Sequence, residues 1–124
     1  GKDYGSLSIA VQFYSDVELV STVPPTVFIP RPTVDSAIVK LTRLDQPPVE
    51  VKDNKIFFDL VRASFQQRRK TLKNSISNVL NLPLSKAEIT GAIEEIGLDS
   101  RVRGEKLGLE EFGRLANQIS KLIE

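Results

Sequence analysis

Hydrophobic positions in the first third of the chain change from a helical spacing to a strand-like one. Apolar side chains recur three or four residues apart over 6–16, which predicts a helix with Ser6 as its N-cap. Residues 17–23 and 35–44 are rich in β-branched side chains, so we expect two strands there. The prolines of segment 26–34 exclude that segment from a central strand. One helix and two strands are too few to form a stable sheet alone.

After residue 52 the apolar spacing is helical throughout, as in a small bundle. The expected helices cover about 53–67, 70–80, 85–96 and 109–122. Asp53 or Asn54 can cap the first of them. Ser85 and Glu88 have the spacing of a capping box, and Gly97 is a typical C-terminal stop for the third helix.

Composition and the change of pattern together indicate two unlike parts in one globular chain. The chain has 124 residues, of which 40% are hydrophobic and 27% charged, enough for a packed core. We predict an α+β fold with a helix and two strands in 1–45, a stiff linker over 46–52 and an all-helical part in 53–124. No apolar run approaches the roughly 18 residues of a membrane span. Because the chain contains no Met, we expect it to be a piece of a longer protein.

Several residue types that carry chemistry are missing. The chain has no Cys and no His, which excludes disulfides, zinc sites of the usual kind and Ser/His or Cys/His nucleophilic pairs. Neither a dinucleotide fingerprint nor a phosphate loop occurs, and no carboxylate pair stands out as a general acid and base. We therefore expect no metal site, and an enzyme that includes these residues would work mainly by positioning its substrate or would carry its chemistry on a segment outside this chain.

Positive charge is concentrated in one stretch near the middle of the chain. The cations are Arg62, Arg68, Arg69, Lys70 and Lys73. No acid occurs between Asp59 and Glu88, although the whole chain balances 17 Lys+Arg against 16 Asp+Glu. Concentrated like charge destabilises the folded state, and a polyanion such as nucleic acid would offset that cost. We predict a phosphate-binding surface here, and the alternative is a helix face that only water covers.

A second basic segment covers 99–106 and surrounds Gly104. Its cations are Arg101, Arg103 and Lys106. Gly104 would give the backbone freedom between the cations, which suits a loop that grips a phosphate. Two acids dilute the charge of this segment, so an ordinary polar loop is the alternative.

Segment 27–39, V-F-I-P-R-P-T-V-D-S-A-I-V, places two prolines at alternate positions before a predicted strand. Such a loop is rigid and could hold the ring of Phe28 where it stacks on a flat ligand, such as a base extruded from a nucleic acid. The alternative, which the physics of the sequence alone favours, is that Phe28 belongs to the core and the prolines block pairing at a sheet edge.

Four blocks of the chain, in order, resemble the ribosomal RNA adenine dimethyltransferase family. They are Y-G-S-L-S-I-A-V-Q-F-Y (4–14), V-F-I-P-R-P-T-V-D-S-A-I-V-K-L (27–41), V-R-A-S-F-Q-Q-R-R-K-T-L-K-N-S (61–75), and I-G-L-D-S-R-V-R-G-E-K-L (96–107) with E-E-F-G-R-L-A-N-Q (110–118). The last two blocks are more similar to the housekeeping enzyme than to its antibiotic-resistance relatives. The resemblance covers essentially the whole chain.

The resemblance implies a class I methyltransferase that uses S-adenosylmethionine to dimethylate two adjacent adenines of small-subunit ribosomal RNA. Residues 1–45 would be the last helix and last two antiparallel strands of its sheet. Residues 53–124 would be a helical domain that docks on the RNA and the immature small ribosomal subunit. Phe28 would contact the target adenine. The family's cofactor loop and catalytic motif would precede this chain, so we expect the chain alone to bind no cofactor and to be inactive.

Two alternatives from other classes stay open. The chain could be a stand-alone RNA- or ribosome-binding helical module without catalytic activity, or a structural adaptor whose basic face is incidental. As a member of the family it would be cytoplasmic and would bind no membrane. We also expect the chain alone to self-associate through strand 35–44, because the neighbour of that strand in the family's sheet would lie outside this chain.

Overall fold

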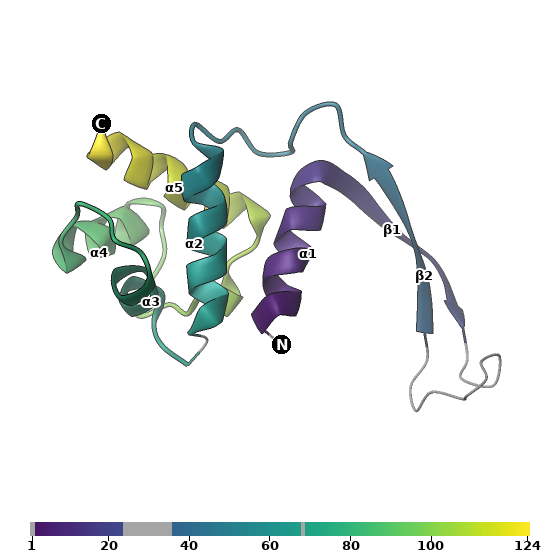
Figure 1. Cartoon of the computed structure of the whole chain (residues 1–124), viewed down its shortest axis with the longest axis horizontal. Coiled ribbons are helices and arrows are strands. Elements are labelled where there is room, and N and C mark those ends of the chain that lie inside the picture. The colour runs from purple at the N-terminus through teal and green to yellow at the C-terminus, as the bar shows by residue number, and fades with distance from the viewer. Residues whose placement is uncertain (1, 24–35, 68) are drawn as a thin grey trace.

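The computed structural model places a helix and an antiparallel hairpin beside a small helical bundle (Figure 1). It describes residues 2–23, 36–67 and 69–124. The elements are α1 (Lys2–Tyr14), β1 (Ser15–Val23), β2 (Ser36–Arg43), α2 (Asn54–Gln66), α3 (Leu72–Val79), α4 (Lys86–Glu95), the 3₁₀ turn η2 (Gly104–Lys106) and α5 (Leu109–Ile123). The described chain is therefore α+β, as predicted, with both strands ahead of the bundle.

Helix α1 begins at Lys2, so the predicted N-cap at Ser6 is wrong. The additional turn runs through Gly5, a poor helix former whose missing side chain lets α1 approach α2 closely. A Cβ atom added at Gly5 would lie 2.6 Å from a ring carbon of Phe65. Packing against α2 therefore outweighs the weak local helix propensity, and β1 follows directly from Ser15.

Strands β1 and β2 pair as an antiparallel two-stranded sheet, and both predicted strands are confirmed. Val17 lies opposite Leu41 and Leu19 opposite Val39, while the register shifts between Leu19 and Ser21. Because opposite residues of two strands share a face, these four side chains form one apolar face of the hairpin. They are 44% to 63% exposed, so this face is largely uncovered.

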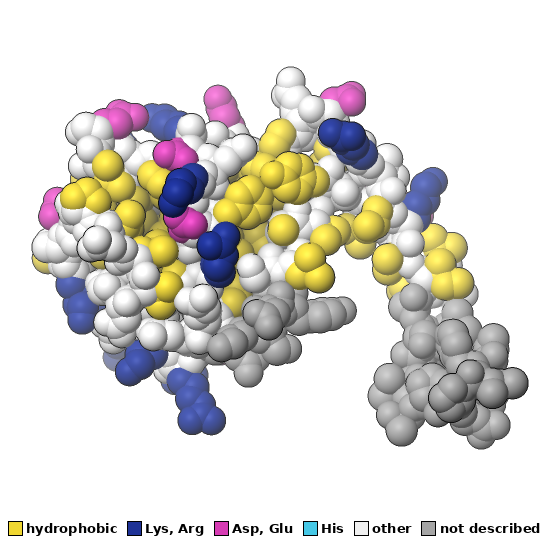
Figure 2. Space-filling model, viewed as in Figure 1, with side chains coloured by type: hydrophobic (Ala, Val, Ile, Leu, Met, Phe, Trp, Pro, Cys, Tyr) yellow, Lys and Arg dark blue, Asp and Glu magenta, His cyan; other side chains and the backbone are white. Residues whose placement is uncertain are grey.

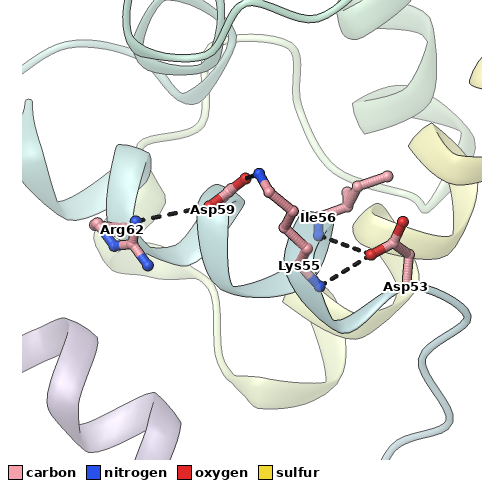
Figure 3. Close-up of polar contacts among 5 residues, drawn as sticks. All are labelled: Asp53, Lys55, Ile56, Asp59 and Arg62. Atoms are coloured by element: carbon pink, nitrogen blue, oxygen red, sulfur yellow. Dashed lines mark hydrogen bonds and ion pairs between the residues drawn. The ribbon is translucent and has the colours of Figure 1, made fainter.

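Local signals in the sequence set the ends of the bundle helices. The Asp53 carboxylate caps α2 by accepting hydrogen bonds of 2.9 and 3.2 Å from two backbone N–H groups of its first turn (Figure 3). Ser85 and Glu88 form the predicted capping box of α4, with hydrogen bonds of 3.1 and 3.0 Å. Helix α4 ends just before Gly97, whose φ of 89° is a backbone conformation that other residues rarely adopt. These caps confirm the predicted boundaries.

The hydrophobic core joins α1 to the bundle. Phe13 of α1 is 1% exposed, and its ring centroid lies 4.9 Å from that of Phe57 in α2. Ile9 of α1 belongs to the same buried cluster as the bundle residues. The division into residues 1–45 and 53–124 stays a prediction, and α1 packs on the second of these two parts (Figure 1).

The predicted linker forms no helix or strand, but its end is fixed to α5. The side-chain amide of Asn117 donates a hydrogen bond of 2.7 Å to the carbonyl oxygen of Glu50 and accepts one of 2.9 Å from the N–H of Lys52. Val49 also contacts the helix, because a Cβ atom at Gly113 would lie 3.2 Å from its side chain. The segment therefore holds a defined path across the bundle.

Candidate nucleic-acid interface

The first predicted basic segment forms the turn between α2 and α3. Arg69 and Lys70 are exposed in this turn, and Lys73 is half-buried in the first turn of α3. Arg68 lies outside the described residues. Thr71 is the N-cap of α3, and its side chain makes no capping hydrogen bond. The cations therefore surround a helix N-terminus, whose amides carry partial positive charge.

The second basic segment lies against the first. The backbone N–H of Leu72 donates a hydrogen bond of 2.7 Å to the carbonyl oxygen of Val102. The N–H of Arg101 donates to Asp99 Oδ1 at 2.7 Å, and this bond, with the charges of Arg101 and Lys73, lowers the pKa of the Asp99 carboxyl. Lys73 thus acts on an acid of the other segment. The sequence does not predict this contact between the two segments, because a hydrogen bond between backbone groups does not depend on residue type.

Gly104 fixes the second segment to α2. It is buried, and a Cβ atom there would lie 2.5 Å from the Cβ of Ser64. Ser64 is itself buried and donates a hydrogen bond of 2.7 Å to the carbonyl oxygen of Leu60. Among the described residues only Gly97 has a positive φ, so the predicted backbone freedom at Gly104 is wrong. The glycine is required by close packing, which makes this loop rigid rather than adaptable.

Two of the cations lie beside acids: Arg101 is 3.5 Å from Asp99 in the second segment, and Arg62 pairs with an acid of its own helix. Asp59 sits between Lys55, at 2.8 Å, and Arg62, at 3.6 Å, along one face of α2 (Figure 3). Arg62 is therefore the cation of this basic stretch that the nearby Asp59 partly balances. Its side chain is 62% exposed, and such surface pairs contribute only about 0–1 kcal/mol to stability. Arg62 also lines a groove between α1 and α2.

Apart from Arg62, the described cations of the two basic segments lie on adjoining stretches of chain at an end of the bundle, which we call the basic end. It consists of Arg69, Lys70, Lys73, Arg101, Arg103 and Lys106. All are exposed except the half-buried Lys73. In Figure 2, Lys and Arg side chains line the lower edge of the helical part, where Figure 1 shows the turn between α2 and α3. The visible Asp and Glu side chains lie higher on the molecule.

Two features are absent from the part of the chain that the structure describes. Within it, no group of three or more His, Cys, Asp or Glu side chains could hold a metal ion. None of the described helices is long and apolar enough to cross a membrane. The predicted contact with the target adenine, Phe28, lies outside the described residues.

Two solved methyltransferase structures have a similar fold. The crystal structure of the 23S rRNA methyltransferase ErmE matches 95% of this chain with a TM-score of 0.66, at 23% identity and over 48% of its own length. That of a dimethyladenosine transferase from Plasmodium falciparum matches 98% of the chain with a TM-score of 0.68, at 22% identity and over 50% of its length. At these identities the likeness concerns the fold alone.

Sequence comparison is more specific. The chain is 55% identical over 119 residues to the ribosomal RNA small subunit methyltransferase A of Bacillus cytotoxicus, and 54% identical to that of Bacillus mycoides. These matches include 95% of this chain but 41% of each relative, so the chain spans less than half of their length. The family described as Ribosomal RNA adenine dimethylase matches residues 1–121. The chain therefore belongs to the ribosomal RNA adenine dimethylase family.

Proposed function

We propose that this chain is the C-terminal part of a cytoplasmic rRNA adenine dimethyltransferase that modifies two adjacent adenines of small-subunit ribosomal RNA. Its role is to dock the enzyme on that RNA in the immature small subunit. Family membership supports the class of RNA. The observation that carries the docking role is the basic end, where two segments distant in the sequence present their cations together.

The basic end has the properties of a phosphate-binding surface. The contacts of Leu72 with Val102 and of Gly104 with Ser64 fix both segments on the bundle. Cations on a fixed backbone can meet several phosphates of one RNA strand at once. Contacts to phosphates set the position of an RNA without reading its sequence, and they weaken as salt rises. The bases to be modified must therefore be selected by another part of the enzyme.

The described residues do not fit S-adenosylmethionine. A glycine-rich cofactor loop leaves the space beside its glycines to the ligand. The described residues contain no such loop, because their glycines are spread along the chain and Gly5, Gly104 and Gly113 pack against Phe65, Ser64 and Val49. The cofactor of the intact enzyme thus belongs to a part outside this chain, and the chain alone binds none and is inactive.

Phe28 is the contact with the target adenine in this proposal. Its support is the F-x-P-x-P pattern of residues 28–32, which the chain shares with the family it resembles. A phenyl ring held beside prolines can stack on a base that has left the helix, because stacking requires only a fixed flat surface.

The apolar face of the hairpin is the second interaction surface in this proposal. This face exposes four large apolar side chains, which is unusual for a surface that only water covers. They are Val17, Leu19, Val39 and Leu41. In the intact enzyme a further strand would pair with the edge of β2 that is free in this chain. When the chain is alone, a second copy would take that place through the free edge of β2.

Salt-dependent RNA binding tests the docking role. Replacing Arg69 and Lys70 with Gln should weaken binding to unrelated RNAs alike. It should also flatten the plot of log affinity against log salt by roughly 0.7–0.9 for each phosphate that the variant no longer binds. The matched control replaces Lys86 and Lys121, exposed cations of α4 and α5, and should change neither quantity. An unchanged slope in the first variant would identify the basic end as a solvated surface.

A further inference from the structure

A groove between α1 and α2 adjoins the basic end and has no role in the docking described above. Its volume is about 410 Å³. Pockets for small ligands measure about 300–1,000 Å³, so the groove could hold one nucleotide. Four apolar and three polar side chains line it.

The groove includes an aromatic ring that the core holds in place. Phe58 of α2 and Ala10 of α1 line it, together with Phe65, which is 9% exposed and packs against Gly5. The ring of Phe58 packs edge-on against Phe57 and Phe13 with centroid distances of 5.0 and 5.2 Å. An aromatic surface of this kind binds a planar base by apolar contact and stacking without regard to its identity.

The rim of the groove carries Arg62, Ser6 and Gln66. Arg62 is 3.6 Å from Asp59, too far for a hydrogen bond, and Asp59 already accepts a hydrogen bond of 2.8 Å from Lys55. Within the described part of the chain the Arg62 guanidinium makes no hydrogen bond, so its planar donors can meet a phosphate in the two-pronged geometry that arginine favours.

The groove is continuous with the basic end. Gln66 at its rim is the last residue of α2, and the carbonyl oxygen of the next residue, Gln67, accepts a hydrogen bond of 3.0 Å from the Lys70 N–H. From the proposed docking role and this continuity, we infer that the groove accepts one unpaired nucleotide of the RNA bound at the basic end. The base lies on the Phe58 ring, and Arg62 binds its phosphate.

The inference requires an unpaired nucleotide because a paired base stays within its helix. Proteins that select RNA sites use bases splayed out from loops and bulges, where the flat faces are accessible. The basic end would bind duplex and bulged RNA alike, whereas the groove would add affinity only for the bulged form. The two surfaces therefore make different predictions for the same RNA.

The test compares two RNA hairpins of equal length on the full chain. One carries a bulged 2-aminopurine, and in the other that base is paired. Ala10→Trp, which fills the groove, should weaken binding of the bulged hairpin about tenfold, within the range expected for one stacked base. It should leave the paired hairpin unchanged and abolish the fluorescence change of 2-aminopurine on binding.

Arg62→Gln keeps the test valid if Trp at position 10 prevents folding. It should weaken binding of the bulged hairpin more than of the paired one. Lys86→Gln, which removes an exposed charge from α4 outside the groove, should affect neither. Equal effects on the two hairpins, or none, would overturn the inference.

The Arg69 and Lys70 variant separates this inference from the docking role. If that variant weakens binding of both hairpins while the groove variants do not distinguish them, the groove inference fails and the docking role stands. If no variant affects either hairpin, both fail. If the groove variants bind both hairpins normally but lose binding to small ribosomal subunits, the groove would belong to a protein partner and the inference would be overturned.

Discussion

The contact between Gly104 and Ser64 predicts that a single methyl group loosens the basic end. Gly104→Ala places a Cβ atom 2.5 Å from the Cβ of Ser64 and 3.2 Å from both its Cα and its carbonyl oxygen. None of these atoms belongs to the far end of a flexible side chain, so the loop must move away from α2. Overpacking of this kind typically costs about 1–3 kcal/mol of folding free energy.

Urea unfolding of the chain measures this cost. A loss of about 2 kcal/mol lowers the midpoint by roughly 1 M, since the slope for small proteins is about 1–3 kcal/mol per M. Gly91→Ala is the matched control, because it adds the same methyl group to an exposed position of α4 with no atom within 4 Å. It should stabilise the chain by about 0.5–1 kcal/mol through its higher helix propensity.

RNA affinity supplies a second measurement. The Gly104→Ala variant loses no cation, but its displaced loop should bind RNA more weakly. Adding Ser64→Gly removes the colliding Cβ atom, so the double variant should be less destabilised than the sum of the two single changes. Equal midpoint shifts for Gly104→Ala and Gly91→Ala would refute the reasoning, because the close contact would then have no energetic effect.

Three further predictions concern other surfaces. Asn117→Ala removes both hydrogen bonds to residues 50–52 and should cost about 1–3 kcal/mol in urea unfolding, while faster proteolysis near Pro48 should report the released segment. Leu19→Lys with Leu41→Lys should make the chain monomeric in light scattering, and an unmodified chain that is already monomeric would contradict self-association. In the intact enzyme, Phe28→Ala should reduce methylation far more than ribosome binding, and equal losses would place Phe28 in the core.

Helix boundaries were predictable where their signals are local. Asp53, Ser85 and Gly97 act on backbone groups within a few residues, so the sequence contains both partners of each interaction. Ser6 shows the limit of such reasoning. It can cap a helix, but α1 starts earlier because Gly5 packs on a distant ring, and a contact across the fold outweighs a local preference.

The candidate interface was predictable in its residues and not in its arrangement. Charge counting identifies both basic segments, but neither the bond of Leu72 to Val102 nor the effect of Lys73 on Asp99 follows from spacing. Gly104 illustrates why. A glycine can be required by a positive φ angle or by a neighbouring atom that leaves no room for a side chain. At Gly104 only the position of Ser64 in the structure distinguishes the two.

The burial of Phe13 against Phe57 has a consequence for the order of events during synthesis. The ribosome makes α1 first, and at about 5–20 residues per second roughly 2–9 s pass before the residues of α2 follow. Among the described residues of this chain, the apolar stripe of α1 then has the hairpin as its neighbour, where Leu7 and Val11 share a groove with Val17, Val39 and Leu41. A nascent chain that stalls between β2 and α2 would therefore expose the apolar side chains of α1 and of the hairpin together. A chaperone would be most needed during this interval.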